Sequence, residues 1–122
     1  MKLCRSCVVA VLALPACASS THVSTSHAAA GAQNAISAAE GAGAAQTPQA
    51  EQHLRLAQDQ YVIAQRLVQR GAPAQANAML VRAQGDAELA LSLAREASVQ
   101  AEARQVDDRI RALSTATSTP QP

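Results

Sequence analysis

Cysteine and histidine are the residues of this 122-residue chain best suited to nucleophilic or metal chemistry, and there are three of each. Two residues separate Cys4 from Cys7, a spacing typical of redox and metal sites. Both cysteines nevertheless lie beside Lys2 and at the start of an apolar run over residues 7–14. That run has the length of a signal peptide's central region and is too short to cross a bilayer. We therefore expect Cys4 and Cys7 to be removed with the signal.

The third cysteine, Cys17, directly follows Leu14, Pro15 and Ala16. This tetrapeptide resembles the lipobox of bacterial lipoproteins, which implies a signal peptide over residues 1–16 and cleavage between Ala16 and Cys17. It also implies that Cys17 carries diacylglycerol and a further acyl chain such as palmitate, since stable anchoring needs more than one chain. The alternative is an ordinary secretory signal cut nearby, in which Cys17 has no role.

The residue after the cysteine, Ala18, bears on the destination of the protein. In the sorting rule of such lipoproteins, an aspartate at this position favours the inner membrane. Its absence implies a lipid-anchored protein on the periplasmic face of the outer membrane.

The segment over residues 17–33 is rich in Ser, Thr, Ala and Gly, and we interpret it as the lipidated cysteine followed by a flexible tether. It contains His22 and His27, which are too few for a metal site, and His53 is expected on the surface. No nucleophile stands beside a base and no glycine-rich phosphate loop is present, so we expect no enzyme, no metal and no cofactor apart from the lipid. The net charge of +1 offers no basis for nucleic-acid binding.

The composition determines which elements can position such residues. Hydrophobic residues make up 48% of the chain, but most are alanine and Tyr61 is the only aromatic residue. Because alanine has high helix propensity and buries little area, the sequence predicts an all-α fold with a thin core. We predict a helical domain over residues 34–113 and a disordered tail over residues 114–122. Within the domain, helices are expected at about 34–41, 48–70 and 73–113, the last two forming a long antiparallel hairpin.

Local signals mark the hairpin. Thr47 is a predicted N-cap, Pro48 suits the first helical position, and Gly71 stops the second helix. Gly85 lies within the predicted third helix, and we expect this helix to continue through it without a break. Residues three and four apart predict a packing seam. The seam comprises Leu54, Tyr61, Ala64, Val68, Ala76, Leu80, Ala83 and Ala87, and Leu56, Ile63 and Leu67 widen it.

The third helix is predicted to extend beyond the second by roughly 27 Å at 1.5 Å per residue. On this overhang the apolar residues move to another face, formed by Val99, Ala103, Val106, Ile110 and Leu113. We interpret these residues as a candidate partner surface. The alternative is that they pack on the first helix or fray. Three oppositely charged pairs four residues apart are also predicted, Glu51–Arg55, Arg82–Asp86 and Asp107–Arg111.

Two resemblances add to this interpretation. Ala64, Gly71, Ala76, Leu80 and Ala83 have the spacing of one tetratricopeptide unit, which implies a single hairpin and no solenoid, because about three units are needed for stability. Residues 34–97, including the run Asp86–Ala90, resemble the alanine-rich proteins of the domain-of-unknown-function 4398 family of proteobacterial envelope lipoproteins. Some members carry a C-terminal peptidoglycan-binding domain like that of OmpA-type proteins. This chain ends without one, so we do not expect direct peptidoglycan binding.

Three functional hypotheses follow. The first is a periplasmic adapter, anchored in the outer membrane by its lipid, that presents a helical face to another envelope protein. The second is a structural lipoprotein that self-associates into a helical bundle. The third, a weak peptidoglycan or small-ligand binder, has no candidate site in the sequence.

Overall fold

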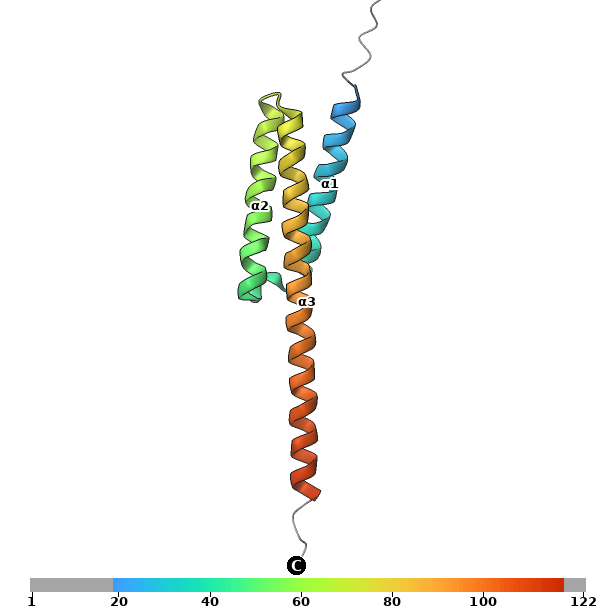
Figure 1. Ribbon diagram of the computed structural model, residues 1–122, viewed down its shortest axis with the longest axis vertical. Coiled ribbons are helices and arrows are strands. Elements are labelled where there is room, and N and C mark those ends of the chain that lie inside the picture. Colours follow the sequence, from blue (N-terminus) through green and yellow to red (C-terminus); the bar gives the residue numbers. More distant parts are fainter. Residues whose placement is uncertain (1–18, 118–122) are drawn as a thin grey trace, which may run out of the picture.

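The structure, a computed structural model that describes residues 19–117, is all-α in those residues (Figure 1). Helix α1 spans Ser19–Gly41, the short 3₁₀ helix η1 spans Ala44–Gln46, α2 spans Pro48–Gln69 and α3 spans Pro73–Thr117. The predicted fold class is therefore confirmed. The predicted signal peptide, Cys17 and the last five residues, 118–122, lie outside the described residues.

The three helices form a short bundle with one helix that continues past it. In Figure 1, α1 runs down along α3, α2 runs back up along α3, and α3 then runs down the whole length of the bundle and beyond it. Helix α3 packs against both other helices, whereas α1 and α2 contact each other much less. The start of α1 and the turn between α2 and α3 consequently lie at the same end of the bundle, and the free part of α3 leaves from the other end.

The first helix is longer than predicted. The flexible tether expected up to residue 33 is instead helical from Ser19, so the short helix expected at 34–41 is only the last part of α1. The periodicity of this segment is not evident from the sequence, because the buried positions hold mostly small residues. Thr25, Ala32, Ile36 and Ala39 are buried at spacings of three, four or seven residues, and they pack on α3. Tertiary packing thus overrides the modest helix propensity of the Ser and Thr residues.

The core is a narrow seam of alanines with a few larger side chains. Leu80 is the largest side chain that is fully buried, and Leu54 and Ile36 are nearly so. Tyr61 is half-buried and packs against both halves of the seam. Because alanine side chains are short, the helix backbones can approach one another closely. The buried alanines are Ala32, Ala39, Ala44, Ala50, Ala57, Ala64, Ala76, Ala83, Ala87, Ala90 and Ala94.

The ends of α2 depend on backbone geometry. Thr47 occupies the N-cap position, but its side chain forms no capping bond and its hydroxyl lies 3.5 Å from the carbonyl oxygen of Gly43. At the other end, the N–H of Ala72 donates to Leu67 and the N–H of Gly71 donates to Val68, which is the Schellman arrangement. Gly71 has φ +72°, a conformation that other residues adopt only with strain, and this explains why the helix stops there.

Helix α3 is continuous through Gly85 and extends to Thr117, four residues beyond the predicted end. The start of the tail expected to be disordered is therefore helical. The hydroxyl groups of Ser114, Thr115 and Thr117 donate to carbonyl oxygens three or four residues earlier, so these polar side chains bond within the helix.

Candidate contact surface on α3

The part of α3 beyond the bundle is exposed on all sides. Ala94 is the last buried residue of the helix, and every residue from 98 to 117 is exposed. We call residues 98–117 the arm. At 1.5 Å per residue the arm extends about 30 Å from the end of the bundle. A helix of this length is marginal in isolation, so the bundle that continues into it stabilises its first turns.

The arm carries a stripe of apolar side chains. Val99, Val106, Ile110 and Leu113 are 64%, 53%, 59% and 69% exposed, and Ala103 lies between them. We call these five residues the arm stripe. Their spacing of 4, 3, 4 and 3 residues is that of positions a and d in a coiled-coil heptad. The candidate partner surface predicted from the sequence is thus solvent-exposed, and within the described residues it packs on no other helix.

The arm stripe faces away from the bundle side of α3. Continuing the buried spacing from Ala90 and Ala94 leads to Ala97 and Ala101. Residues two positions further on, Val99 and Ala103, lie about 200° around the helix at 3.6 residues per turn. The side of α3 that binds α1 and α2 therefore does not continue into the arm stripe, which is a separate surface.

Charged residues surround the arm stripe in equal numbers of each sign. The arm contains three acidic residues, Glu102, Asp107 and Asp108, and three basic residues, Arg104, Arg109 and Arg111. The side chain of Arg111 donates to Asp108 at 3.2 Å in an exposed pair, whereas the sequence predicted Asp107 as its partner. Among the described residues, Glu102 and Arg109 form no ion pair. Their charges are therefore available to a partner.

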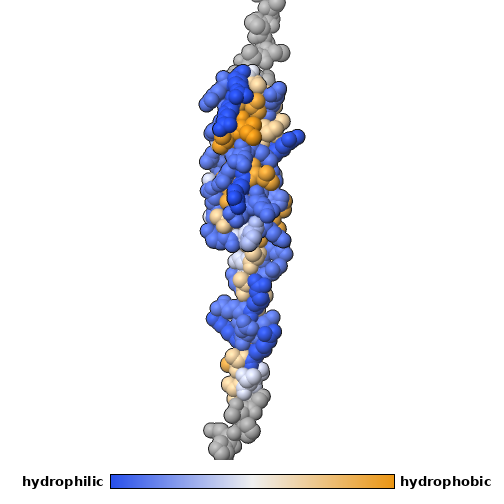
Figure 2. All heavy atoms as spheres, turned by 90° about the vertical axis from the view of Figure 1, so that its left-hand side faces the viewer, coloured by the Kyte–Doolittle hydropathy of each residue, from blue (hydrophilic) through white to orange (hydrophobic). Residues whose placement is uncertain are grey.

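Most residues of the predicted seam lie in the core. Leu54, Ala64, Ala76, Leu80, Ala83 and Ala87 are buried. Val68 differs, because it is 45% exposed in the last turn of α2. Leu56 and Ile63, expected to widen the seam, are 48% and 43% exposed. The outer side of α2 consequently exposes apolar side chains to solvent, and they are visible on the side of the bundle that Figure 2 shows.

A polar cluster joins α2 to α3 and was not predicted. The side-chain amide of Gln60 donates to Asp86 at 2.8 Å, and the Nδ1 atom of His53 lies 3.2 Å from the other carboxylate oxygen. The predicted partner of Asp86, Arg82, forms no hydrogen bond or ion pair with it. Gln60 and His53 are seven residues apart on one side of α2, and this spacing was the signal that could have identified the cluster. The cluster fixes the register of the hairpin.

The predicted pair between Arg55 and Glu51 is present, with the guanidinium donating at 2.8 Å on the exposed side of α2. Both side chains are well exposed, so this pair contributes only a few tenths of a kcal/mol. In the described part of the chain, no group of three His, Cys, Asp or Glu side chains is placed to hold a metal ion.

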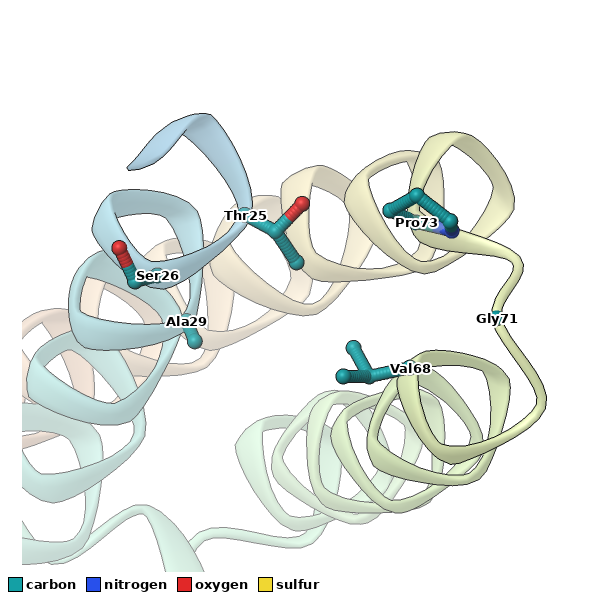
Figure 3. Close-up of a pocket in the computed structure, with 6 residues that line it drawn as sticks. All are labelled: Thr25, Ser26, Ala29, Val68, Gly71 and Pro73. Carbon is teal, nitrogen blue, oxygen red and sulfur yellow. The ribbon is translucent and has the colours of Figure 1, made fainter. Parts of the chain in front are cut away.

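A half-open cavity of about 400 Å³ lies between the first turns of α1 and the turn that joins α2 to α3 (Figure 3). The hydroxyl-bearing residues at its edge are Thr25 and Ser26, and no acid, base or thiol lines it. The geometry therefore offers space for an apolar group but no chemistry. The cavity is lined by Thr25, Ser26, Ala29, Val68, Gly71 and Pro73.

None of the helices within residues 19–117 combines the length and apolar character needed to cross a bilayer. Comparison of the chain with known protein families, with curated proteins and with solved structures gives no match. The resemblance of residues 34–97 to a family of envelope lipoproteins therefore stays a prediction, as do the lipobox and its consequences.

Proposed function

We propose that this protein is a lipoprotein of the outer membrane, facing the periplasm, that acts as a helical protein–protein adapter through the arm stripe. The observation that carries the proposal is the exposure of four large apolar side chains in heptad spacing on the arm of α3, which no other described element covers. Surfaces of this kind expose apolar area to water unless a partner helix covers them.

The arrangement of the helices supports a membrane-anchored adapter. In the sequence, Cys17 precedes the start of α1 by two residues, and α1 starts at the end of the bundle opposite the arm (Figure 1). Acyl chains on Cys17 would place this end at the membrane. Helix α3 has 45 residues and a length of about 67 Å. In an upright molecule it would present the arm stripe well away from the lipid surface.

A self-associating structural lipoprotein is the second candidate function. The heptad spacing of the arm stripe favours it, because this pattern is typical of helices that pair with helices. The two candidates use the same surface and differ in what covers it. Neither requires a catalytic residue, a metal or a nucleic acid, and membrane contact occurs through the lipid on Cys17.

The anchor is tested by Cys17→Ser in the full chain, with Cys7→Ser as the matched control. We expect Cys17→Ser to move the protein from the membrane to the soluble fraction after cell fractionation, because the attachment site of the acyl chains is lost. Cys7→Ser should stay membrane-bound, since Cys7 belongs to the predicted signal peptide. Recovery of Cys17→Ser with the membranes would contradict the lipoprotein proposal.

The contact surface is tested by photo-crosslinking in cells. Separate probes replace Val106 on the arm stripe, Leu56 on the outer side of α2, and Arg104 on the arm as a control outside the stripe. The adapter proposal expects adducts from Val106 to one distinct envelope protein, whose mass identifies the partner. Adducts from Val106 only to the protein itself would establish the second candidate. Equal labelling from Val106 and Arg104 would show that the arm stripe is no specific contact surface.

A further inference from the structure

We infer that the arm stripe from Val99 to Ile110 is covered by the arm of a second copy of this chain, paired with it as an antiparallel coiled coil. The inference rests on the second candidate function, self-association through the arm stripe, and it names the orientation and register of the two copies. The heptad positions of the apolar and charged residues on the arm determine the orientation of the pair.

The apolar residues define the heptad. Val99, Val106 and Leu113 take position d, and Ala103 and Ile110 take position a. The flanking g positions then hold Glu102 and Arg109, and the flanking e positions hold Gln100, Asp107 and Ser114. These flanking residues decide orientation and register, because charges at e and g meet those of the partner helix.

A parallel pair of arms places unfavourable charges together. In that orientation each g residue faces the e residue five positions later in the partner. Glu102 would then face Asp107 of the second copy, and this repulsion would occur twice across the two-fold axis. Arg109 would face Ser114, which offers no compensating charge. The charge pattern therefore disfavours the parallel dimer.

The antiparallel pair gives favourable contacts in one register. When Val99 packs opposite Ile110 of the second copy, Ala103 packs opposite Val106, and both layers recur across the two-fold axis. In this register the g positions bring Glu102 to Arg109 of the second copy, again twice. The e positions bring Gln100 to Asp107, a pair that can form a hydrogen bond. Glu102 and Arg109 form no ion pair in the described residues, so bringing them together breaks no ion pair, whereas the side-chain amide of Gln100 already donates to Glu96 at 3.0 Å.

The neighbouring antiparallel register is unfavourable. A shift of one heptad would bury Leu113 opposite Ala103, but it would also place Arg109 opposite Arg109 and Asp107 opposite Asp107. Like charges in contact oppose association. Charge thus selects the register in which Val99 meets Ile110.

The bundles do not obstruct this pairing. In the favourable register Ala94, the last buried residue of α3, lies opposite residue 115 of the second copy, so each arm ends where the other bundle begins. The result is a rod with one bundle at each end. Two helices of 45 residues that overlap in this way span about 96 Å. With both anchors in one membrane, such a rod would lie along the lipid surface, unlike the upright single molecule.

The test uses cysteine cross-linking of the full chain in intact bacterial envelopes, with two copies that carry tags of different mass. One copy carries Val99→Cys and the other Ile110→Cys. We expect a mixed disulfide between a Val99→Cys copy and an Ile110→Cys copy. Two copies that carry the same substitution should give at least tenfold less disulfide product. Ala101→Cys, on the other side of the helix, is the matched control and should give no product with either.

A charge exchange tests the register. Glu102→Arg replaces two attractive pairs by two repulsive pairs. Each attraction lost and each repulsion gained is worth a few tenths of a kcal/mol, so together they should give about tenfold less of the mixed product. Combining it with Arg109→Glu in the same chain restores both pairs and should restore the yield. In a parallel dimer Glu102→Arg would instead increase the disulfide product between two Val99→Cys copies, because it would remove the repulsion from Asp107.

Each outcome has a distinct meaning. Products between identical copies at Val99 would overturn the antiparallel arrangement. The absence of all disulfide products, together with photo-adducts from Val106 to another protein, would overturn the inference and leave the adapter proposal intact. The absence of both disulfide products and specific photo-adducts would overturn both.

Discussion

At the scale of single residues, the polar cluster between α2 and α3 is the most specific interaction in the bundle. Alanine contacts are similar to one another, so an alanine seam by itself permits slippage between helices. Asp86 accepts from Gln60 at 2.8 Å and lies 3.2 Å from His53, and a shifted register would separate these groups. A single carboxylate therefore selects one alignment among several that the seam would accept.

Replacing this carboxylate should destabilise the bundle measurably. Asp86→Ala leaves the half-buried amide of Gln60 without its acceptor, and we expect a loss of about 1–2 kcal/mol in the free energy of unfolding. The measurement is urea unfolding followed by circular dichroism. Glu51→Ala, which breaks the exposed pair with Arg55, is the matched control and should cost less than about 0.5 kcal/mol. Equal effects of the two substitutions would argue against a role of the cluster in the register.

At the scale of elements, the contrast between Gly71 and Gly85 shows how backbone geometry determines helix ends. Both residues are exposed, and a Cβ atom added to either would meet nothing within 4 Å. Gly71 has φ +72° in the Schellman turn after α2, whereas Gly85 lies within the regular helix α3. The same residue type therefore stops one helix and is accommodated inside another.

Replacing each of the two glycines by alanine should change the stability of the protein in opposite directions. Gly71→Ala should destabilise the protein by about 1 kcal/mol, because an L side chain is strained at this φ. Gly85→Ala should stabilise it by up to about 1 kcal/mol, because alanine has the higher helix propensity and open space surrounds this position. Urea unfolding of both variants beside the parent checks the signs. A destabilising Gly85→Ala would show that α3 is not regular at this point.

At the scale of the whole molecule, the bundle and the arm have different roles. The bundle holds nearly all of the buried side chains, and the arm holds none. A substitution in the arm can therefore change binding without changing the stability of the bundle. The bundle, conversely, is thin, and it depends on the few large side chains among its alanines.

Leu80 is the side chain on which the bundle depends most. It is 2% exposed, and Leu80→Asp would bury a carboxylate with no partner, so we expect the bundle to unfold at 37 °C. Val81→Asp is the matched control, because Val81 is 60% exposed on the next position of α3 and its replacement should leave the fold intact. Circular dichroism at 222 nm as a function of temperature distinguishes the two. An unchanged helical signal for Leu80→Asp would contradict the seam.

The sequence by itself determined the helical class, the start of α2 at Pro48 and its end before Gly71, the buried seam of Leu80 and its neighbouring alanines, and the separate arm stripe. These features follow from local propensity and from residue spacing, which do not require knowledge of the partner helix. Alanine bias hid the start of α1, because Ala32 and Thr25 do not stand out as apolar positions in a segment of small residues.

Only the tertiary structure decided which small residues of α1 are buried, that Val68 and Leu56 are exposed, and that Asp86 bonds to α2 instead of to Arg82. The physical reason is common to all three. An α-helix, with 3.6 residues per turn, presents several possible packing faces. When most side chains are alanine, hydrophobicity alone does not choose among these faces. The choice is made by the fit of α1 and α2 on α3, where backbone proximity and the cluster around Asp86 favour one arrangement.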